Sequence, residues 1–249
     1  MLTHDAKLSE LVNRLKEMAG GNLRSVILYG SAARGDFQAH RSDLNVLCVL
    51  GSLAAGELRR VAPAVQWWVN EQREPAPLFF AEEDLRRSAD VFAIELLDIR
   101  DAHRVLFGKD PVATLDIPMN LHRVELEHEL RTTLLKLRQH FLLAADKPRE
   151  LTAVLAKSTS SLNALFRHFL IAYGETPPPN SNELLARTAA ISGTDASAFH
   201  HAFEFRDTAH TGKDIVAVYG ACLQALERVV STLDELIPKR EWQRAAKGQ

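Results

Sequence analysis

The sequence predicts an α+β protein, with a mixed β-sheet and flanking helices followed by an all-α helical bundle. Before residue 112, short apolar runs rich in β-forming residues alternate with helix-like segments and turn residues. After residue 119, apolar residues instead recur with a period of about 3.6, which is typical of long amphipathic helices. We therefore expect a first domain over residues 1–112, a helical bundle over residues 119–238 and a basic tail over residues 239–249.

The composition is that of an ordinary globular chain. Its 249 residues are 46% hydrophobic and 25% charged, with a formal net charge of -2. A chain so close to neutrality has no field that attracts a polyanion, so general nucleic-acid binding is not expected. Cys48 and Cys222 lie in apolar patterns without metal-ligand spacing, which indicates buried free thiols in a reducing compartment. No apolar run has the length of a membrane span and no signal peptide is evident, so we expect a cytoplasmic protein without a membrane partner.

The first two elements lead to the most informative stretch of the chain. Apolar residues of segment 8–19 recur at helical spacing, and the glycines at 20–21 end the pattern. Residues 25–29 form a mostly apolar run of β-forming residues, which predicts a buried strand. Gly30 and Ser31 end this strand abruptly, and the residues after them can open a short helix. Backbone N–H groups then converge at one spot, an arrangement that favours phosphate binding.

A second strand is predicted over residues 44–50, directly after Asp43. Asn45 lies two residues beyond Asp43, and residues two apart on a strand share one face. We therefore expect the side chains of Asp43 and Asn45 to point together into the crevice at the end of the first strand.

These residues resemble the nucleotidyltransferase superfamily typified by DNA polymerase β and the aminoglycoside nucleotidyltransferases. The superfamily pattern is Gly-Ser or Gly-Gly after an apolar strand, then a spacer, then Asp-x-Asp or Asp-x-Glu within a second apolar strand. Here Gly30-Ser31 is followed by 11 residues and then by Asp43-Leu44-Asn45. The resemblance implies a nucleotidyltransferase fold over about residues 22–108.

The resemblance also implies a function, namely nucleoside triphosphate binding and Mg²⁺-dependent transfer of a nucleoside monophosphate to a hydroxyl acceptor of unknown identity. Gly30 and Ser31 would hold the phosphates. Arg34 or Arg41 would steady the triphosphate, or else belong to a solvated loop. Asp43 would be the catalytic carboxylate and the metal ligand, since Mg²⁺ prefers carboxylate oxygens.

The metal-binding part of the pattern is incomplete in this sequence. The superfamily supplies three carboxylates, and this chain clearly supplies only Asp43. Asn45 stands at the second catalytic position, where its carbonyl oxygen can act as a ligand but brings no charge. The third carboxylate would lie on a strand predicted over residues 78–80, where Leu78 is nearest to that position. The chain is therefore either a transferase with an impaired site or a pseudoenzyme, that is, a catalytically inactive nucleotide-binding or protein-interaction module.

Residues 53–72 predict a helix that Pro63 either kinks or divides in two. Trp67 and Trp68 are adjacent, so we expect only one of them to be buried in the core. The other would lie at a groove or a domain contact, either in simple packing or stacked on a base.

Two acidic segments follow before the domain boundary. Residues 82–84 are best explained as the acidic first turn of a helix rather than as metal ligands. Residues 94–99 predict a fourth strand, on which Glu95 and Asp98 would point to opposite sides. Residues 101–107 resemble the segment that closes many nucleotidyltransferase domains, with residues 104–108 reading Arg-Val-Leu-Phe-Gly.

The second half of the chain begins after a connector at 111–118. Arg206 and His210 resemble a ribonuclease Arg-x4-6-His motif but have only three residues between them, so a solvated arginine and a helix-end histidine are favoured. His200 and His201 have no partner at ligand spacing and are expected at the surface or partly buried. Helices are predicted around residues 130–141, 155–169, 184–190, 196–205 and 215–236.

Overall fold

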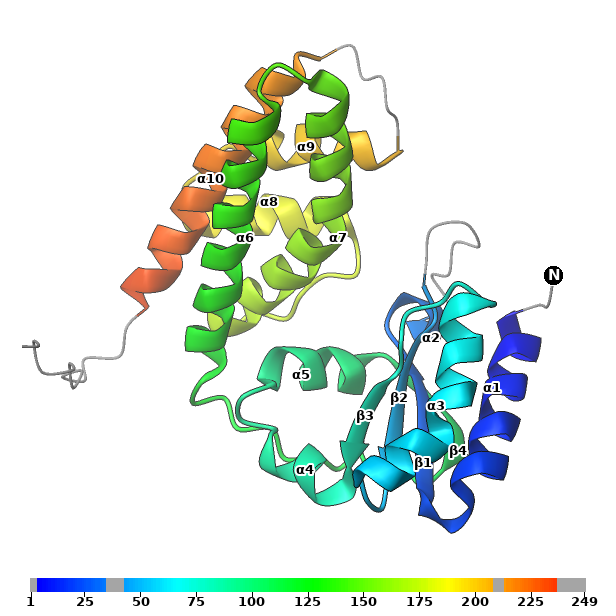
Figure 1. Ribbon diagram of the computed structural model, residues 1–249. Coiled ribbons are helices and arrows are strands. Elements are labelled where there is room, and N and C mark those ends of the chain that lie inside the picture. Colours follow the sequence, from blue (N-terminus) through cyan, green and yellow to red (C-terminus); the bar gives the residue numbers. More distant parts are fainter. Residues whose placement is uncertain (1–3, 35–42, 208–212, 237–249) are drawn as a thin grey trace, which may run out of the picture. The chain divides into compact units, whose positions relative to one another are not determined.

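The computed structural model describes residues 4–34, 43–207 and 213–236 of the chain (Figure 1). The chain divides into two compact units, Met1–His122 and Arg123–Gln249. The elements of the first unit are, in order, α1 (His4–Ala19), η1 (Gly20–Asn22), β1 (Leu23–Tyr29), α2 (Ser31–Arg34), β2 (Asn45–Leu50), α3 (Ala55–Asn70), β3 (Leu78–Ala81), α4 (Glu82–Arg87), α5 (Ala93–Asp101) and β4 (His103–Gly108).

The four strands form one mixed sheet in the order β3-β2-β1-β4. The central strand β1 pairs antiparallel with β2 and with β4, whereas β2 pairs parallel with β3. Tyr29, at the end of β1, lies opposite Asn45 on one side and opposite His103 on the other. The expected α+β class with a mixed sheet and flanking helices is confirmed.

Alternate residues of the two central strands enter different hydrophobic clusters. Leu28 and Cys48 belong to a cluster with residues of α1 and α3. Ile27, Leu47 and Val49 belong to a second cluster with residues of α4, α5 and the segment after β4. Because helices cover both faces (Figure 1), β1 and β2 are apolar along most of their length.

The strand predicted over residues 94–99 is wrong, because this segment belongs to helix α5. Its buried residues include Ala93, Leu96 and Ile99, which recur every three residues as on one side of a helix. The fourth strand is instead β4, which lies beside β1 at the edge of the sheet. Glu95 and Asp98 are therefore three residues apart on a helix, and not on opposite sides of a strand.

Helix α3 runs unbroken with Pro63 inside it, so Pro63 does not divide it in two. Trp67 and Trp68 are both buried, at 7% and 0% exposure, which corrects the expectation that only one would be. The Trp68 ring lies in the core, and its Nε1–H donates to the carbonyl of Pro75 at 2.9 Å. Trp67 is covered from α1, where the guanidinium carbon of Arg14 lies 4.3 Å from its ring centroid. Both rings are buried because α1 packs beside α3.

The second unit is helical throughout the residues that the structure describes. Helix α8 (Ser181–Ser192) is capped at its N-terminus by Asn180, whose side chain accepts the N–H groups of Asn182 and Glu183. Gly193 caps its C-terminus with a left-handed φ of 64°. Between helices, the hydroxyl of Tyr219 donates to a backbone carbonyl of α6 at 2.9 Å. The helices are α6 (His122–Ala144), α7 (Pro148–Ala172), α8 (Ser181–Ser192), α9 (Ala196–Asp207) and α10 (Ile215–Glu235).

By length and composition alone, α10 could cross a membrane, with a mean hydropathy of 1.2 over its most apolar window. One such helix is weak evidence for a membrane span, because the core helix of a globular protein can have the same length and hydropathy. Residues including Val218, Leu226 and Leu233 of α10 are buried within its unit. Cys222 of α10 and Cys48 of β2 are both buried and free, as expected.

Candidate functional site

Strand β1 ends in a turn that requires glycine. Gly30 has a φ of 79°, in the left-handed region that side chains disfavour. Its N–H donates to the carbonyl of Ala102 at 3.0 Å, which ties the turn to the start of β4. A Cβ atom at position 30 would lie 3.4 Å from Nδ2 of Asn45. The amide of Asn45 therefore lies directly against this turn, which we call the Gly30 turn.

Ser31 is exposed and opens the four-residue helix α2. The N–H of Ala33 donates back to the carbonyl of Gly30 at 3.0 Å, which closes the turn. Arg41 and the side chain of Arg34 lie outside the described part of the chain, so their role in holding phosphates stays a prediction.

Asp43 and Asn45 occupy the entry to β2. Asp43 is exposed, whereas Asn45 is half-buried and is the first residue of the strand. Leu44 and Val46 are buried in the cluster with α1 and α3, while Leu47 is buried in the opposite cluster. Since side chains alternate along a strand, Asn45 lies on the same face as Leu47, toward α5. The direction of the Asp43 side chain stays a prediction.

Tyr29 lies beside Asn45 in a row that crosses three strands. Burial raises the pKa of the Tyr29 hydroxyl, and the nearby carboxylate of Glu95 in α5 raises that pKa further. Tyr29 is therefore neutral at physiological pH and keeps its hydroxyl proton. The row presents the phenol of Tyr29 next to the amide of Asn45, so β1 and β2 contribute two neutral hydrogen-bonding groups here.

His103 completes the row and ties β4 to the segment after it. Its Nε2 lies 2.8 Å from a carboxylate oxygen of Asp110, and its Nδ1 lies 3.1 Å from the carbonyl of Arg100. The other oxygen of Asp110 accepts the N–H groups of Val112 and Ala113, each at 3.0 Å. Burial opposes the ionisation of Asp110, but the hydrogen bonds from His103 and the two amides outweigh it and hold the pKa of Asp110 below its ordinary value.

A carboxylate that sequence analysis did not single out lies against the backbone of the site. One oxygen of Glu74 accepts the N–H of Leu44 at 3.1 Å, and the other lies 2.7 Å from Nζ of Lys7. Nζ of Lys7 also donates to the carbonyl of Gln72 at 3.1 Å. The two charged side chains are only 7% and 10% exposed, so this ion pair is buried. The sequence did contain one indication of a buried ion pair, namely Lys7, which lies one helical turn before Leu11 on the apolar side of α1.

The loop after α3 presents Glu74 from a fixed backbone. The N–H of Glu74 donates to the carbonyl of Trp68 at 3.4 Å, and the next residue, Pro75, accepts the indole N–H of Trp68. The preceding residue, Arg73, has a φ of 61° and is the only non-glycine residue with positive φ among those described. This left-handed conformation costs on the order of 1 kcal/mol, so the rest of the loop must offset the cost.

No carboxylate reaches the site from β3. The parallel register places Leu78 opposite Leu47, and β3 contains only apolar residues. The acidic residues 82–84 form the first turn of α4, as expected. Among the residues that the structure describes, no three His, Cys, Asp or Glu side chains are grouped so as to hold a metal ion. The described residues therefore do not fit the three-carboxylate Mg²⁺ site that the resemblance implies.

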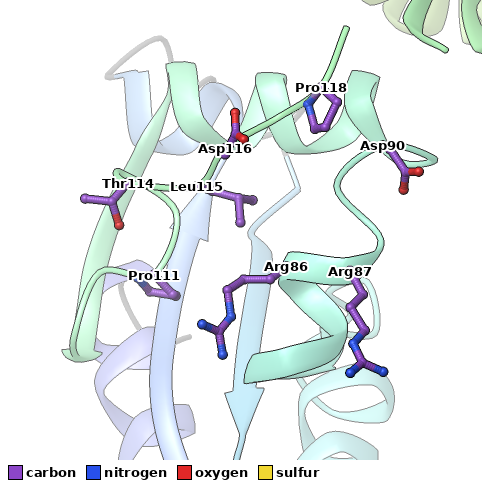
Figure 2. A pocket seen from close by; sticks show the side chains of 8 residues that line it. All are labelled: Arg86, Arg87, Asp90, Pro111, Thr114, Leu115, Asp116 and Pro118. Atoms are coloured by element: carbon purple, nitrogen blue, oxygen red, sulfur yellow. The ribbon is translucent and has the colours of Figure 1, made fainter. Parts of the chain in front are cut away.

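A pocket of about 470 Å³ lies elsewhere on the first unit, between α4 and the segment after β4 (Figure 2). Figure 2 shows Arg86 and Arg87 projecting from α4, with Asp90 and Asp116 at the other end of the pocket. Both arginines pair with the same carboxylate, that of Glu83, at 2.8 and 2.9 Å. None of the residues that line this pocket belongs to the Gly30 turn.

The alternative ribonuclease motif is not tested, because His210 and the side chain of Arg206 lie outside the described part of the chain. His200 and His201 are both partly buried on α9, as expected.

Comparison with known proteins gives matches among solved structures only. No family model matches the sequence, and no curated protein matches it. Among solved structures, the fold is similar to that of a spectinomycin adenyltransferase from Enterococcus faecialis, solved with ATP and spectinomycin. The TM-score is 0.49 at 11% sequence identity, over 88% of this chain and 98% of that chain. At this TM-score the likeness assigns no superfamily, nucleotide, acceptor or activity to this chain.

Proposed function

We propose that the chain binds a nucleoside triphosphate at the Gly30 turn and has little or no nucleotidyltransferase activity. The observation that supports this most is the amide of Asn45 against Gly30. Where the superfamily pattern has a carboxylate, this chain has a side chain with N–H donors. A carboxylate at that point repels phosphate oxygens unless a cation lies between them, whereas an amide can donate a hydrogen bond to them directly.

The same substitution argues against efficient transfer. Attack on the α-phosphorus of a triphosphate needs two cations that activate the attacking hydroxyl and stabilise the leaving pyrophosphate. Asp43 is the one carboxylate of the superfamily pattern that this chain clearly retains, because Asn45 stands at the second position and Leu78 is nearest to the third. The residues that would cradle the phosphates, Gly30 and Ser31, do not depend on those carboxylates.

Calorimetric titration of ATP, GTP, CTP and UTP, with Mg²⁺ and again with EDTA, tests the proposal. We expect at least one triphosphate to bind, with less than a tenfold loss of affinity in EDTA. Ser31→Ala should weaken binding about threefold to tenfold, because a hydroxyl donor is lost while the backbone amides remain. The matched control is Ser9→Ala, which removes an exposed serine of α1.

Asn45→Asp gives the opposite test. A carboxylate beside the Gly30 turn should weaken triphosphate binding in EDTA and strengthen the binding of Mn²⁺. It should not restore turnover, because a third carboxylate is still lacking and such residues act as a unit. Robust pyrophosphate release by the wild type, abolished by Asp43→Ala, would instead establish an active transferase. If none of the four triphosphates binds, a protein-interaction module remains.

A further inference from the structure

We propose that Glu74 is a positioning residue for this site: it holds the Asp43-Leu44-Asn45 segment in place through the Leu44 amide, with Lys7 as its counter-charge. The inference rests on the triphosphate binding proposed above, because Glu74 would influence the affinity for triphosphate through the Asp43-Leu44-Asn45 segment. It adds a residue that the superfamily pattern of Gly-Ser and Asp-x-Asp does not contain.

The topology of the sheet brings Glu74 to this place. Strands β2 and β3 run parallel, and Leu47 of β2 lies opposite Leu78 of β3. The residues before β3 therefore run beside the residues before β2. Glu74 uses this position to accept the N–H of Leu44 at 3.1 Å. Leu44 is only 1% exposed, and a buried backbone N–H needs an acceptor.

Both oxygens of the Glu74 carboxylate are engaged, which defines its role. One accepts the Leu44 N–H and the other pairs with Nζ of Lys7 at 2.7 Å. Hydrogen bonds to an ionised group are about twice as strong as neutral ones. Glu74 therefore supports the neighbours of Leu44 and does not replace the missing third carboxylate as a metal ligand.

The ion pair joins three parts of the unit at one point. Lys7 belongs to α1, Glu74 to the loop after α3, and Leu44 to the entry of β2. Nζ of Lys7 also donates to the carbonyl of Gln72, which holds the same loop. Because Asn45 begins β2 directly after Leu44, a shift of the Leu44 backbone moves the Asn45 amide relative to the Gly30 turn. Such a shift changes the group that we expect to contact phosphate.

A double-mutant cycle separates positioning from stability. The affinity of whichever of ATP, GTP, CTP and UTP binds most tightly is measured for Glu74→Gln, for Asn45→Ala and for the double variant. We expect Glu74→Gln alone to raise Kd about tenfold, within the range of couplings between neighbouring residues, and less than twofold when Asn45 is already alanine. The matched control is Glu10→Gln. It also removes a carboxylate that is paired with a basic side chain, but the pair of Glu10 with Arg14 is half-exposed.

Hydrogen exchange of single amides in ¹⁵N-leucine-labelled protein gives a readout that does not depend on the ligand. Glu74→Gln should speed the exchange of the Leu44 amide at least tenfold and leave that of Leu47, in the middle of β2, unchanged. A loss of global stability would speed both. If Glu74→Gln does not fold, Glu74→Asp serves instead, because the shorter side chain keeps its charge but cannot reach both Lys7 and Leu44.

The outcomes separate the two proposals. Wild-type affinity in Glu74→Gln, with normal triphosphate binding by the wild type, would overturn the role of Glu74 and leave the proposed function intact. An equal loss of affinity in both Asn45 backgrounds, with faster exchange at Leu44 and Leu47 alike, would make Glu74 a contributor to stability only. A wild type that binds none of the four triphosphates would overturn both proposals.

Discussion

Replacement of Lys7 by methionine should destabilise the first unit by about 3 kcal/mol, because Glu74 is left as a buried carboxylate without its counter-charge. Methionine keeps most of the length and the apolar stem of lysine, so the packing around position 7 of α1 changes little. What is lost is the 2.7 Å ion pair with Glu74 and the 3.1 Å hydrogen bond to the carbonyl of Gln72.

The magnitude follows from burial. Removal of one partner from a buried ion pair costs about 3–5 kcal/mol, and side-chain exposures of 7% and 10% place this pair near the buried limit. Removal of both charges in Lys7→Met/Glu74→Leu should cost less, about 1–2 kcal/mol, because only the hydrogen bonds of Leu44 and Gln72 are then unsatisfied. The double variant should therefore be more stable than Lys7→Met alone.

Urea unfolding followed by tryptophan fluorescence measures this difference. Trp67 and Trp68 are both buried in α3 of the first unit, and a Trp242→Phe background removes the third tryptophan. With a slope of about 1.5 kcal/mol per molar urea, Lys7→Met should lower the midpoint by about 2 M.

The half-exposed pair between Glu10 and Arg14 on the same helix supplies the control, and Glu10→Gln should cost less than about 1 kcal/mol. Equal costs for Lys7→Met and Glu10→Gln, or a double variant less stable than Lys7→Met, would refute the reasoning.

Three further predictions concern other buried or constrained residues of the chain. Burial raises the pKa of the Cys48 thiol above its ordinary value and that of Cys222 to about 12, so neither should react with DTNB at about pH 8 until urea unfolds the protein; rapid reaction of the native protein would contradict this. Gly108→Ala should lower the free energy of unfolding in urea by more than about 2 kcal/mol, because the φ of Gly108 is 81° and a Cβ would lie 1.9 Å from a backbone oxygen of β1. Gly174→Ala is the control: the φ of Gly174 is 76° but a Cβ would meet open space, so the loss should be about 1 kcal/mol. The lowered pKa of Asp110 means that its charge stabilises the fold above its ordinary pKa of 3.8 and that this contribution is lost as the pH falls; Asp110→Asn should thus be less stable than wild type at neutral pH and equally stable at low pH, and a gap independent of pH would count against it.

Local patterns in the sequence predict the strands that carry the Gly30 turn, and they fail for α5. Residues 25–29, 44–50 and 78–80 are short apolar runs next to turn residues, and each belongs to or largely coincides with a strand of the sheet. Residues 94–99 have a similar composition, yet they form a helix. A short apolar run fits either structure, and pairing of β4 with the distant β1 settles which one forms. That long-range pairing leaves no trace in the local pattern.

The candidate site likewise has one contact that the sequence predicts and one that it does not. The contact between Gly30 and Asn45 follows from the pairing of two consecutive strands, which an apolar run, a Gly-Ser turn and a second apolar run predict. The pair of Lys7 with Glu74 joins residues 67 positions apart in the sequence. To predict it, one needs the burial of Lys7 on α1 and the parallel register of β3 beside β2. The lysine within an apolar helix stripe indicates that a partner exists but does not identify it.

The place of β4 in the sheet also sets an order of assembly. β1 is paired with β4, and residues 30–102 lie between them in the chain. The buried members of the cluster on the α1 and α3 side come from residues 8–68, and only partly buried residues of β4 pack against it, whereas the opposite cluster includes buried residues as late as Ile117. During synthesis the first cluster can therefore form while one edge of β1 still lacks its partner. An unpaired apolar edge can pair with another chain, so a polypeptide that stops before β4 should aggregate rather than persist as a smaller folded unit.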